Sequence, residues 1–202
     1  MKRPTERDEN SDWNRFAIPQ FVELLRSGSV GRGPAIVGID GRGGSGKSTL
    51  AALLSANCTG TVIVHTDDIA CSRTFFGWDT LLAKELLEPI RRTGLPFTFR
   101  SNHDKPRDIA VSDQTTLLLV EGAGSIRRSL RMLYDATVWV DTAPETARQR
   151  LVELGEDPQG YHDDRMIEEN SLLNADRPWA HAMFHVSGTN SATNGTVLVR
   201  RT

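Results

Sequence analysis

Apolar and polar positions along the chain fall into alternating blocks that predict strands and helices in turn. Short, nearly continuous apolar runs predict strands buried on both faces, at residues 35–40, 61–66, 116–122 and 136–141. Longer amphipathic stretches predict helices at residues 47–56, 79–93, 125–133, 144–154 and 163–173. Two further apolar runs follow, AMFHV at 182–186 and TVLVR at 196–200. Strands that alternate with helices indicate an α/β fold, in which helices cover both faces of a mostly parallel central sheet.

The N-terminal region has a different pattern. Residues 1–12 are charged, whereas residues 13–26 carry apolar side chains at helical spacing, with a break near Pro19, which predicts a short amphipathic helix. The glycine-rich stretch GSVGRGP that follows predicts a linker. We therefore divide the chain into an N-terminal segment, residues 1–34, and a single domain, residues 35–202, because no later linker separates two apolar patterns.

Two polar stretches interrupt the second half of the pattern. Residues 94–113 contain Pro and Arg and predict a loop. Residues 155–163 form another polar stretch between two predicted helices. Because a polar segment at this place is suited to exclude water during group transfer, we expect a mobile lid near 155–163.

Composition and charge narrow the class of protein. A chain of 202 residues is long enough for one α/β domain with a sizeable core. The net charge of −2 provides no global basic field, so we expect no nucleic-acid partner. Cys58 and Cys71 have neither metal-ligand nor disulfide-framework spacing, which fits a reducing cytosol. No apolar run approaches the roughly 18 residues that span a bilayer, and the N-terminus lacks a signal-peptide core, so we expect a cytoplasmic protein without a membrane partner.

The segment GRGGSGKS, residues 41–48, matches the phosphate-loop pattern G-x-x-x-x-G-K-[ST]. It follows a predicted strand and precedes a predicted helix, so its backbone N–H groups and the helix N-terminus can converge on phosphate oxygens. Lys47 is expected to reach the β- and γ-phosphates of ATP, and Ser48 to place its hydroxyl on Mg²⁺. The predicted ATP-binding residues are Gly41, Gly43, Gly44, Ser45, Gly46, Lys47, Ser48 and Thr49.

Acidic residues follow two of the predicted strands, at the sheet edge where α/β proteins bind ligands. Asp67 and Asp68 come directly after the strand at 61–66, and a carboxylate there can accept a hydroxyl proton or help to hold Mg²⁺. Glu121 ends the strand at 116–122, where P-loop proteins carry an acid beside the metal. We therefore expect Ser48 and Glu121 to be the metal-binding residues.

Two arginines lie on the helix predicted at 144–154, and one of them could steady the transferring phosphoryl group. Arg148 and Arg150 are two positions apart, so they cannot share one helix face. The sequence leaves open which of them points at the phosphates, and both are candidate catalytic residues.

The ordered set of motifs resembles the uridine kinase-like branch of P-loop small-molecule kinases, related to phosphoribulokinase and bacterial pantothenate kinase. The similar segments, between about residues 35 and 188, are GIDGRGGSGKSTLA, HTDD, LLLVEG, YDATVWVDTAPETARQRLVE and ADRPWAHAMFHVSGT. The resemblance implies a P-loop NTPase three-layer sandwich. It further implies that Asp67 is the catalytic base and that Asp68 and His103 are substrate-binding residues.

The chain departs from that family in the acceptor region. Ile69 and Ala70 stand where the family has Phe-Tyr, and Thr98 and Phe99 replace a Tyr and an Asp in the segment PFTFRSNH. These positions would help to recognise a nucleoside, so the identity of the acceptor stays open.

The expected function is an ATP- and Mg²⁺-dependent kinase that phosphorylates a hydroxyl of a small metabolite, with a nucleoside such as uridine as one candidate. A nucleoside monophosphate kinase is the first alternative, favoured by arginines that could line the acceptor side: Arg73, Arg91, Arg100 and Arg107. A nucleotide-binding regulatory module that hydrolyses ATP slowly is the second alternative. The sequence does not indicate an oligomeric state.

Overall fold

The structure is a computed structural model that describes residues 12–29, 33–69, 76–93, 95–100, 108–154, 161–189 and 195–202, with only the backbone described at 161–164. The expected substrate-binding residue His103 and residues 155–160 of the expected lid lie outside the described residues. Within the described ranges, no helix is both long and apolar enough to span a bilayer.

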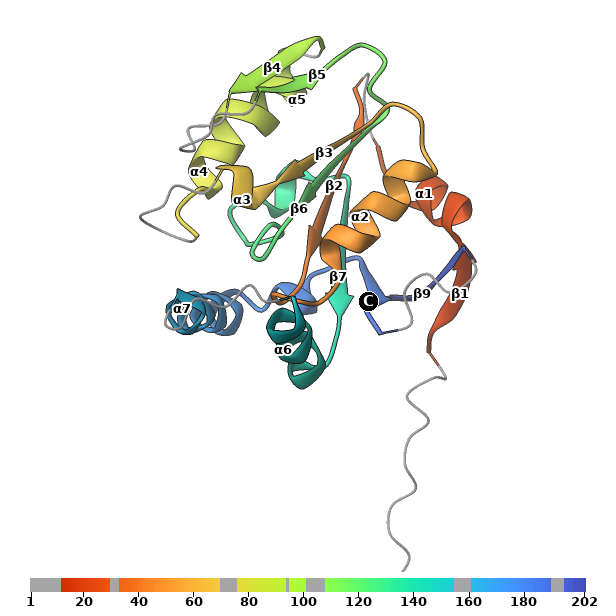
Figure 1. The fold of residues 1–202 in the computed structure, drawn as a ribbon. Coiled ribbons are helices and arrows are strands. Elements are labelled where there is room, and N and C mark those ends of the chain that lie inside the picture. The colour runs from red at the N-terminus through yellow and green to blue at the C-terminus, as the bar shows by residue number, and fades with distance from the viewer. Residues whose placement is uncertain are drawn as a thin grey trace, which may run out of the picture.

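A seven-stranded sheet forms the centre of the fold, in the order β1-β9-β8-β7-β2-β6-β3 (Figure 1). Five strands form its parallel part: β2 (Ala35–Asp40), β3 (Thr61–His65), β6 (Leu117–Glu121), β7 (Ala136–Asp141) and β8 (Phe184–Ser187). Two antiparallel strands extend it, β9 (Thr196–Arg201) and β1 (Asn14–Ala17). The predicted strands and the mostly parallel sheet are confirmed, and β2, which leads into the glycine loop, lies between β6 and β7.

Helices pack on both faces of the sheet, because successive residues of each buried strand point to opposite sides. Leu117 and Leu119 of β6 face a core beneath α1 (Ile18–Arg26) and α2 (Lys47–Ala56). Leu118 and Val120 face a second core beneath a continuous helical segment. That segment consists of α4 (Asp79–Leu82), the π-helical turn η1 (Ala83–Leu87) and α5 (Glu88–Thr93). The expected three-layer arrangement is therefore confirmed (Figure 1).

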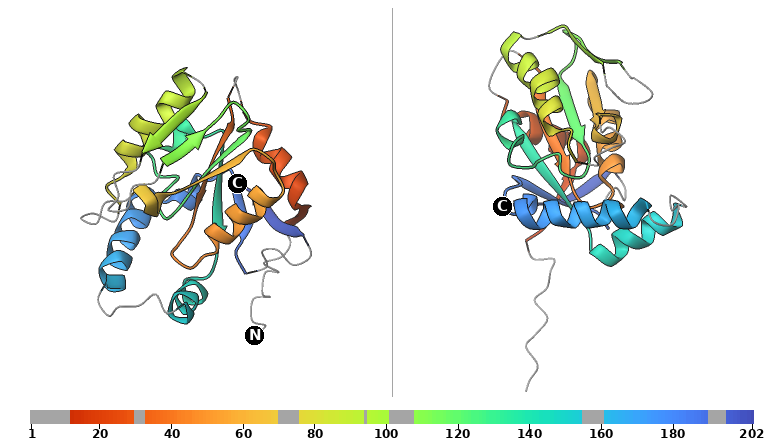
Figure 2. Two further views of the ribbon diagram at one scale, coloured as in Figure 1. Left: turned by 45° about the horizontal axis from the view of Figure 1, so that its top comes forward. Right: turned by 90° about the vertical axis from the view of Figure 1, so that its left-hand side faces the viewer.

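Two more helices lie across the carboxyl end of the sheet (Figure 2). They are α6 (Pro144–Glu153), close to the predicted helix at 144–154, and α7 (Tyr161–Asp176), which extends the helix predicted at 163–173 in both directions. This pair brings residues that are distant in sequence to the glycine loop.

The described part of the N-terminal segment, from residue 12, begins with a strand and not with the predicted helix. Pro19 occupies the first turn of α1, where its missing N–H removes no hydrogen bond, so the helix begins at Ile18 instead of Trp13. Residues 14–17 pair antiparallel with β9. The apolar face of α1, which includes Phe21 and Leu25, is buried in the same core as α2.

Two other predictions of secondary structure were wrong. Residues 125–133 form turns and only a short 3₁₀ helix, Arg131–Leu133, because Asp40 accepts hydrogen bonds from the Gly124 and Ile126 N–H groups and holds the backbone out of a helical path. The predicted loop at 94–113 contains two antiparallel strands, β4 (Phe97–Arg100) and β5 (Asp108–Val111).

Candidate nucleotide-binding site

The glycine loop between β2 and α2 takes a backbone path that side chains would block. Gly44 has φ +74°, and a Cβ atom there would lie 2.1 Å from the carbonyl oxygen of Ala147 in α6. Gly46, with φ +100°, is the N-terminal cap of α2. The loop therefore packs directly against the backbone of α6 and ends at the start of a helix, whose N-terminus is suited to an anion.

A pocket of about 510 Å³ opens above this loop. Lys47 lies inside it, with its ammonium donating to the Arg42 carbonyl oxygen at 2.8 Å. This bond holds the charged end of Lys47 across the loop, in position for a phosphate. Gly43, Gly44, Gly46, Ser48 and Thr49 also line the pocket. Gly41 and Ser45 do not line it, and the Ser45 carbonyl accepts a hydrogen bond from Thr142 in the loop after β7.

The predicted metal-binding residues lie next to each other at one side of the pocket. Ser48 Oγ donates to Glu121 Oε1 at 3.0 Å, and the His65 ring Nδ1 contacts the same oxygen at 2.5 Å. The strand register explains this, because His65 and Ile39 both pair with Glu121 across neighbouring parallel strands. The His65 ring orients the carboxylate and was not predicted from the sequence.

The residues present fit a magnesium ion held together with nucleotide phosphates. A hydroxyl and a carboxylate oxygen are the ligands that Mg²⁺ prefers, and it usually takes only one or two of them from the protein when phosphates supply others. Among the described residues, no group of three or more His, Cys, Asp or Glu side chains is arranged to hold a metal ion. Ser48 and Glu121 would therefore bind the metal only in company with the nucleotide.

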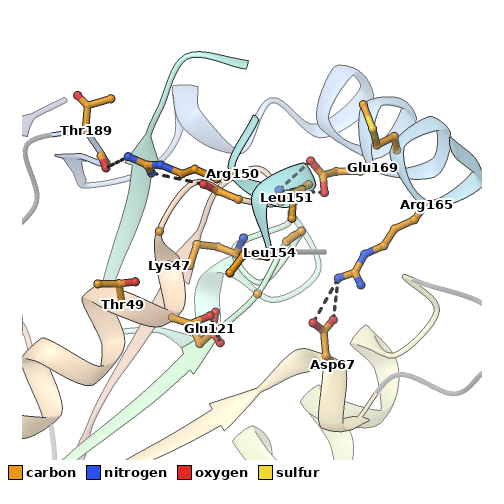
Figure 3. Close-up of a pocket in the computed structure, with 18 residues that line it drawn as sticks. Lys47, Thr49, Asp67, Glu121, Arg150, Leu151, Leu154, Arg165, Glu169 and Thr189 are labelled. Carbon is orange, nitrogen blue, oxygen red and sulfur yellow. Dashed lines mark hydrogen bonds and ion pairs between the residues drawn. The ribbon is translucent and has the colours of Figure 1, made fainter. Parts of the chain in front are cut away.

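Asp67 also lines the pocket, and its carboxylate points to Arg165 (Figure 3). It lies in the single turn of α3 (Thr66–Ile69) that directly follows β3. Arg165 of α7 donates to both of its carboxylate oxygens, at 3.0 and 3.2 Å. Asp68, the next residue of the turn, is not among the residues that line the pocket.

The structure separates the two arginines of α6. Arg150 lines the pocket, where its guanidinium donates to the carbonyl oxygens of Gly44, Ser45 and Gly188 at 3.4, 3.5 and 3.1 Å. It thereby ties the loop to the segment after β8. Arg148 lies outside this pocket and lines a smaller neighbouring one.

The helix α7 contributes two residues that were not predicted. Besides Arg165, Glu169 is buried beside the loop, and both of its carboxylate oxygens lie 3.2 Å from the Gly43 nitrogen, whose N–H they accept. The four-residue spacing of Arg165 and Glu169 places them on one face of a helix, and this was the available signal. Nothing in the local sequence indicated that this face would meet the loop.

The buried carboxylate of Asp40 binds the backbone at the start of the glycine loop. Asp40 accepts hydrogen bonds from the N–H groups of Gly41, Gly124 and Ile126, at 2.7, 2.8 and 3.0 Å. Complete burial raises the pKa of Asp40 to about 6, although these three bonds and the charge of Lys47 act against that increase. Asp40 therefore joins the start of the glycine loop to the turn after β6, which contains the pocket residues Gly122 and Ala123.

Comparisons with known proteins establish the fold. No protein-family model matches the chain, and no curated protein matches it in sequence. A possible uridine kinase from Bacillus stearothermophilus superposes with a TM-score of 0.60 at 20% identity, over 82% of this chain and 95% of that one. The proposed kinase of a fructose transport system from Silicibacter sp. gives a TM-score of 0.51 at 19% identity, over 83% and 95% of the two chains. The chain thus has the P-loop kinase fold of these two proteins.

Proposed function

We propose that the protein is an ATP- and Mg²⁺-dependent kinase that transfers the γ-phosphoryl group to a hydroxyl of a small metabolite. The observation that carries this proposal is the arrangement of one pocket. The phosphate loop with Lys47, the Ser48–Glu121 pair and Asp67 all line it. The P-loop kinase fold supports the same proposal.

Each residue has a defined part in the transfer. The loop N–H groups and Lys47 hold the phosphates, while Ser48 and Glu121 would hold Mg²⁺, which offsets negative charge on the phosphate oxygens. Asp67 accepts the proton of the acceptor hydroxyl as its oxygen bonds to the γ-phosphorus. The bond between that phosphorus and the β,γ-bridging oxygen breaks, and ADP leaves with the bonding electrons.

The acceptor is the least constrained part of the proposal. Two of the positions where the chain departs from the uridine kinase-like family are buried: Ile69 is 0% exposed and Phe99 is 4% exposed. Both pack in the core beneath α4 and α5, so neither side chain can recognise a substrate. Uridine is therefore one candidate among small hydroxyl compounds.

One observation favours the alternative of a phosphate acceptor. Arg165 stands on the acceptor side of the pocket, where it could bind an anionic group. The arginines first suggested for this role give no support among the described residues, because Arg91 pairs with Asp135 at 2.8 Å and Arg100 lies beside Asp108 at 3.9 Å. Arg73 and Arg107 lie outside the described residues.

The test is ADP release by the purified protein with Mg-ATP, screened against nucleosides, nucleotides, sugars and vitamin precursors. A hydroxyl acceptor that raises turnover well above the basal rate is the expected result. The Lys47→Ala variant should show neither turnover nor stabilisation by Mg-ATP, because it lacks the charge that faces the phosphates. Turnover only with nucleoside monophosphates would support the alternative, and slow ATP loss with every acceptor would support a regulatory module.

A further inference from the structure

Two side chains of α7 face the pocket, and each forms hydrogen bonds with one of the pocket's polar groups. Glu169 accepts the Gly43 N–H with both carboxylate oxygens, and Arg165, one helical turn earlier, binds both oxygens of Asp67 (Figure 3). Glu169 is only 7% exposed, so its negative charge lies at the loop and not in solvent. An anion and a cation of the protein thus occupy the two ends of the proposed transfer path.

The Gly43 N–H lies on the side of the glycine loop that α7 borders, because its acceptor Glu169 is one helical turn from Arg165, which binds Asp67. In a loop of this pattern Lys47 reaches the β- and γ-phosphates and Ser48 binds Mg²⁺, while backbone N–H groups that precede them, such as that of Gly43, are donors for phosphate oxygens. The phosphoryl group to be transferred must lie between the loop and Asp67, and α7 borders that part of the pocket. The Glu169 carboxylate, an anion that accepts hydrogen bonds through oxygen atoms, therefore holds the N–H that a terminal phosphate would use.

We propose that Glu169 is a specificity-determining residue that separates nucleoside triphosphates from diphosphates at this site. A terminal phosphate can take the Gly43 N–H only if the Glu169 carboxylate leaves, because the two anions compete for one donor and repel each other. A diphosphate, held by Lys47 and Ser48, leaves Glu169 in place. This inference rests on the proposed nucleotide site and names the residue that sets its preference.

Binding of a terminal phosphate also frees the Asp67 carboxylate from its ion pair with Arg165. A terminal phosphate attracts the Arg165 guanidinium, which pairs well with phosphate oxygens, and so draws it from Asp67. Asp67 is then available to the acceptor hydroxyl. When the phosphoryl group has left, Glu169 returns to Gly43 and Arg165 to Asp67, and the diphosphate does not compete with Glu169 for the Gly43 N–H.

The experiment compares Glu169→Gln with Glu168→Gln, its exposed neighbour on the same helix. Calorimetric titration with Mg²⁺ measures the binding of ADP and of a non-hydrolysable ATP analogue to both variants and the wild type. Glutamine keeps an oxygen for the Gly43 N–H but loses the charge, and charge-assisted hydrogen bonds are roughly twice as strong as neutral ones. We expect Glu169→Gln to bind the analogue about tenfold more tightly, which corresponds to about 1.4 kcal/mol, and ADP within about twofold of wild type. Glu168→Gln should change neither affinity.

Three results would overturn this inference. They are unchanged binding of the analogue, weaker binding of the analogue, and equal tightening for both nucleotides, since the last would reflect only the overall charge of the pocket. If Glu169→Gln does not fold, Glu169→Ala carries the same expectation. A wild-type protein that binds neither nucleotide more tightly than Lys47→Ala does would instead refute the proposed function, and the inference with it.

Discussion

The contact between the glycine loop and α6 can be tested by substituting a single hydrogen atom with a methyl group. In Gly44→Ala, the new Cβ would lie 2.1 Å from the Ala147 carbonyl oxygen and 2.9 Å from its carbon, distances that real Cβ atoms do not adopt. The residue would also keep φ near +74°, which costs an alanine about 1–2 kcal/mol. Moving the α6 backbone away to make room adds about 1–3 kcal/mol, as overpacking does elsewhere. We therefore expect a loss of about 2–5 kcal/mol in the free energy of unfolding.

Gly195→Ala is the matched control, because it isolates the conformational part of this cost. Gly195 has φ +70°, and no atom of the described residues lies within 4 Å of a Cβ built there. We expect this variant to lose only about 1–2 kcal/mol. Urea unfolding followed by far-ultraviolet circular dichroism measures both losses against wild type. Equal losses for the two variants would show that Gly44 does not touch α6, and would refute the reasoning about how the loop is held.

Two further predictions concern carboxylates. Asp67→Asn should lower turnover by on the order of 10²–10⁴-fold with ATP affinity nearly unchanged, as expected for the loss of a general base, whereas Asp68→Asn should lower turnover less. Single-turnover kinetics measure the rate of both variants, and comparable losses would mean that the pair acts in metal binding and not in base catalysis. The pKa of Asp141 is lowered by its interaction with the His185 ring, whose Nδ1 lies 3.7 Å from its carboxylate, and by the charge of Arg200. A lowered pKa means that Asp141 stabilises the protein above its ordinary pKa of 3.8 and loses this effect as the pH falls through the folded value. Asp141→Asn should therefore be less stable than wild type at pH 7 in urea unfolding. The difference should shrink only as the pH falls below about 3.8 and should disappear below the lowered pKa; a constant difference would contradict the pairing. The raised pKa of Asp40 acts in the opposite sense, so only the difference between variant and wild type is informative.

The glycine loop and its acidic neighbour could be predicted, because the sequence pattern that identifies each of them lies within a few consecutive residues. The glycine pattern ending in Lys47 and Ser48 determines the loop, and the position of Glu121 at the end of an apolar strand places it beside Ser48. Parallel strands bring their carboxyl ends to one edge, so the two residues meet although they are far apart in sequence. For these residues, knowledge of the fold class was sufficient.

The parts that depend on contacts between distant segments could not be predicted. Asp40 appeared to be the last residue of a strand, yet its carboxylate holds Gly124 and Ile126 and prevents the helix that the apolar pattern of 125–133 favours. Glu169 meets Gly43 because α7 lies across the carboxyl end of the sheet, beside the glycine loop. The placement of such a helix is set by packing among many side chains and leaves no mark in the spacing of residues.

The pairing of β1 with β9 has a consequence for how the protein is made. Asn14 lies opposite Val199, so β1 finds its partner only after nearly all of the described residues have been synthesised. Until then, the apolar face of α1 can cover the sheet, but the edge of β1 has no neighbour to pair with. Contacts between such distant residues also slow folding, because a long stretch of chain must be ordered before they form. The sheet is therefore complete only once β9 has been made, well after the residues of the glycine loop, 41–48, have been synthesised.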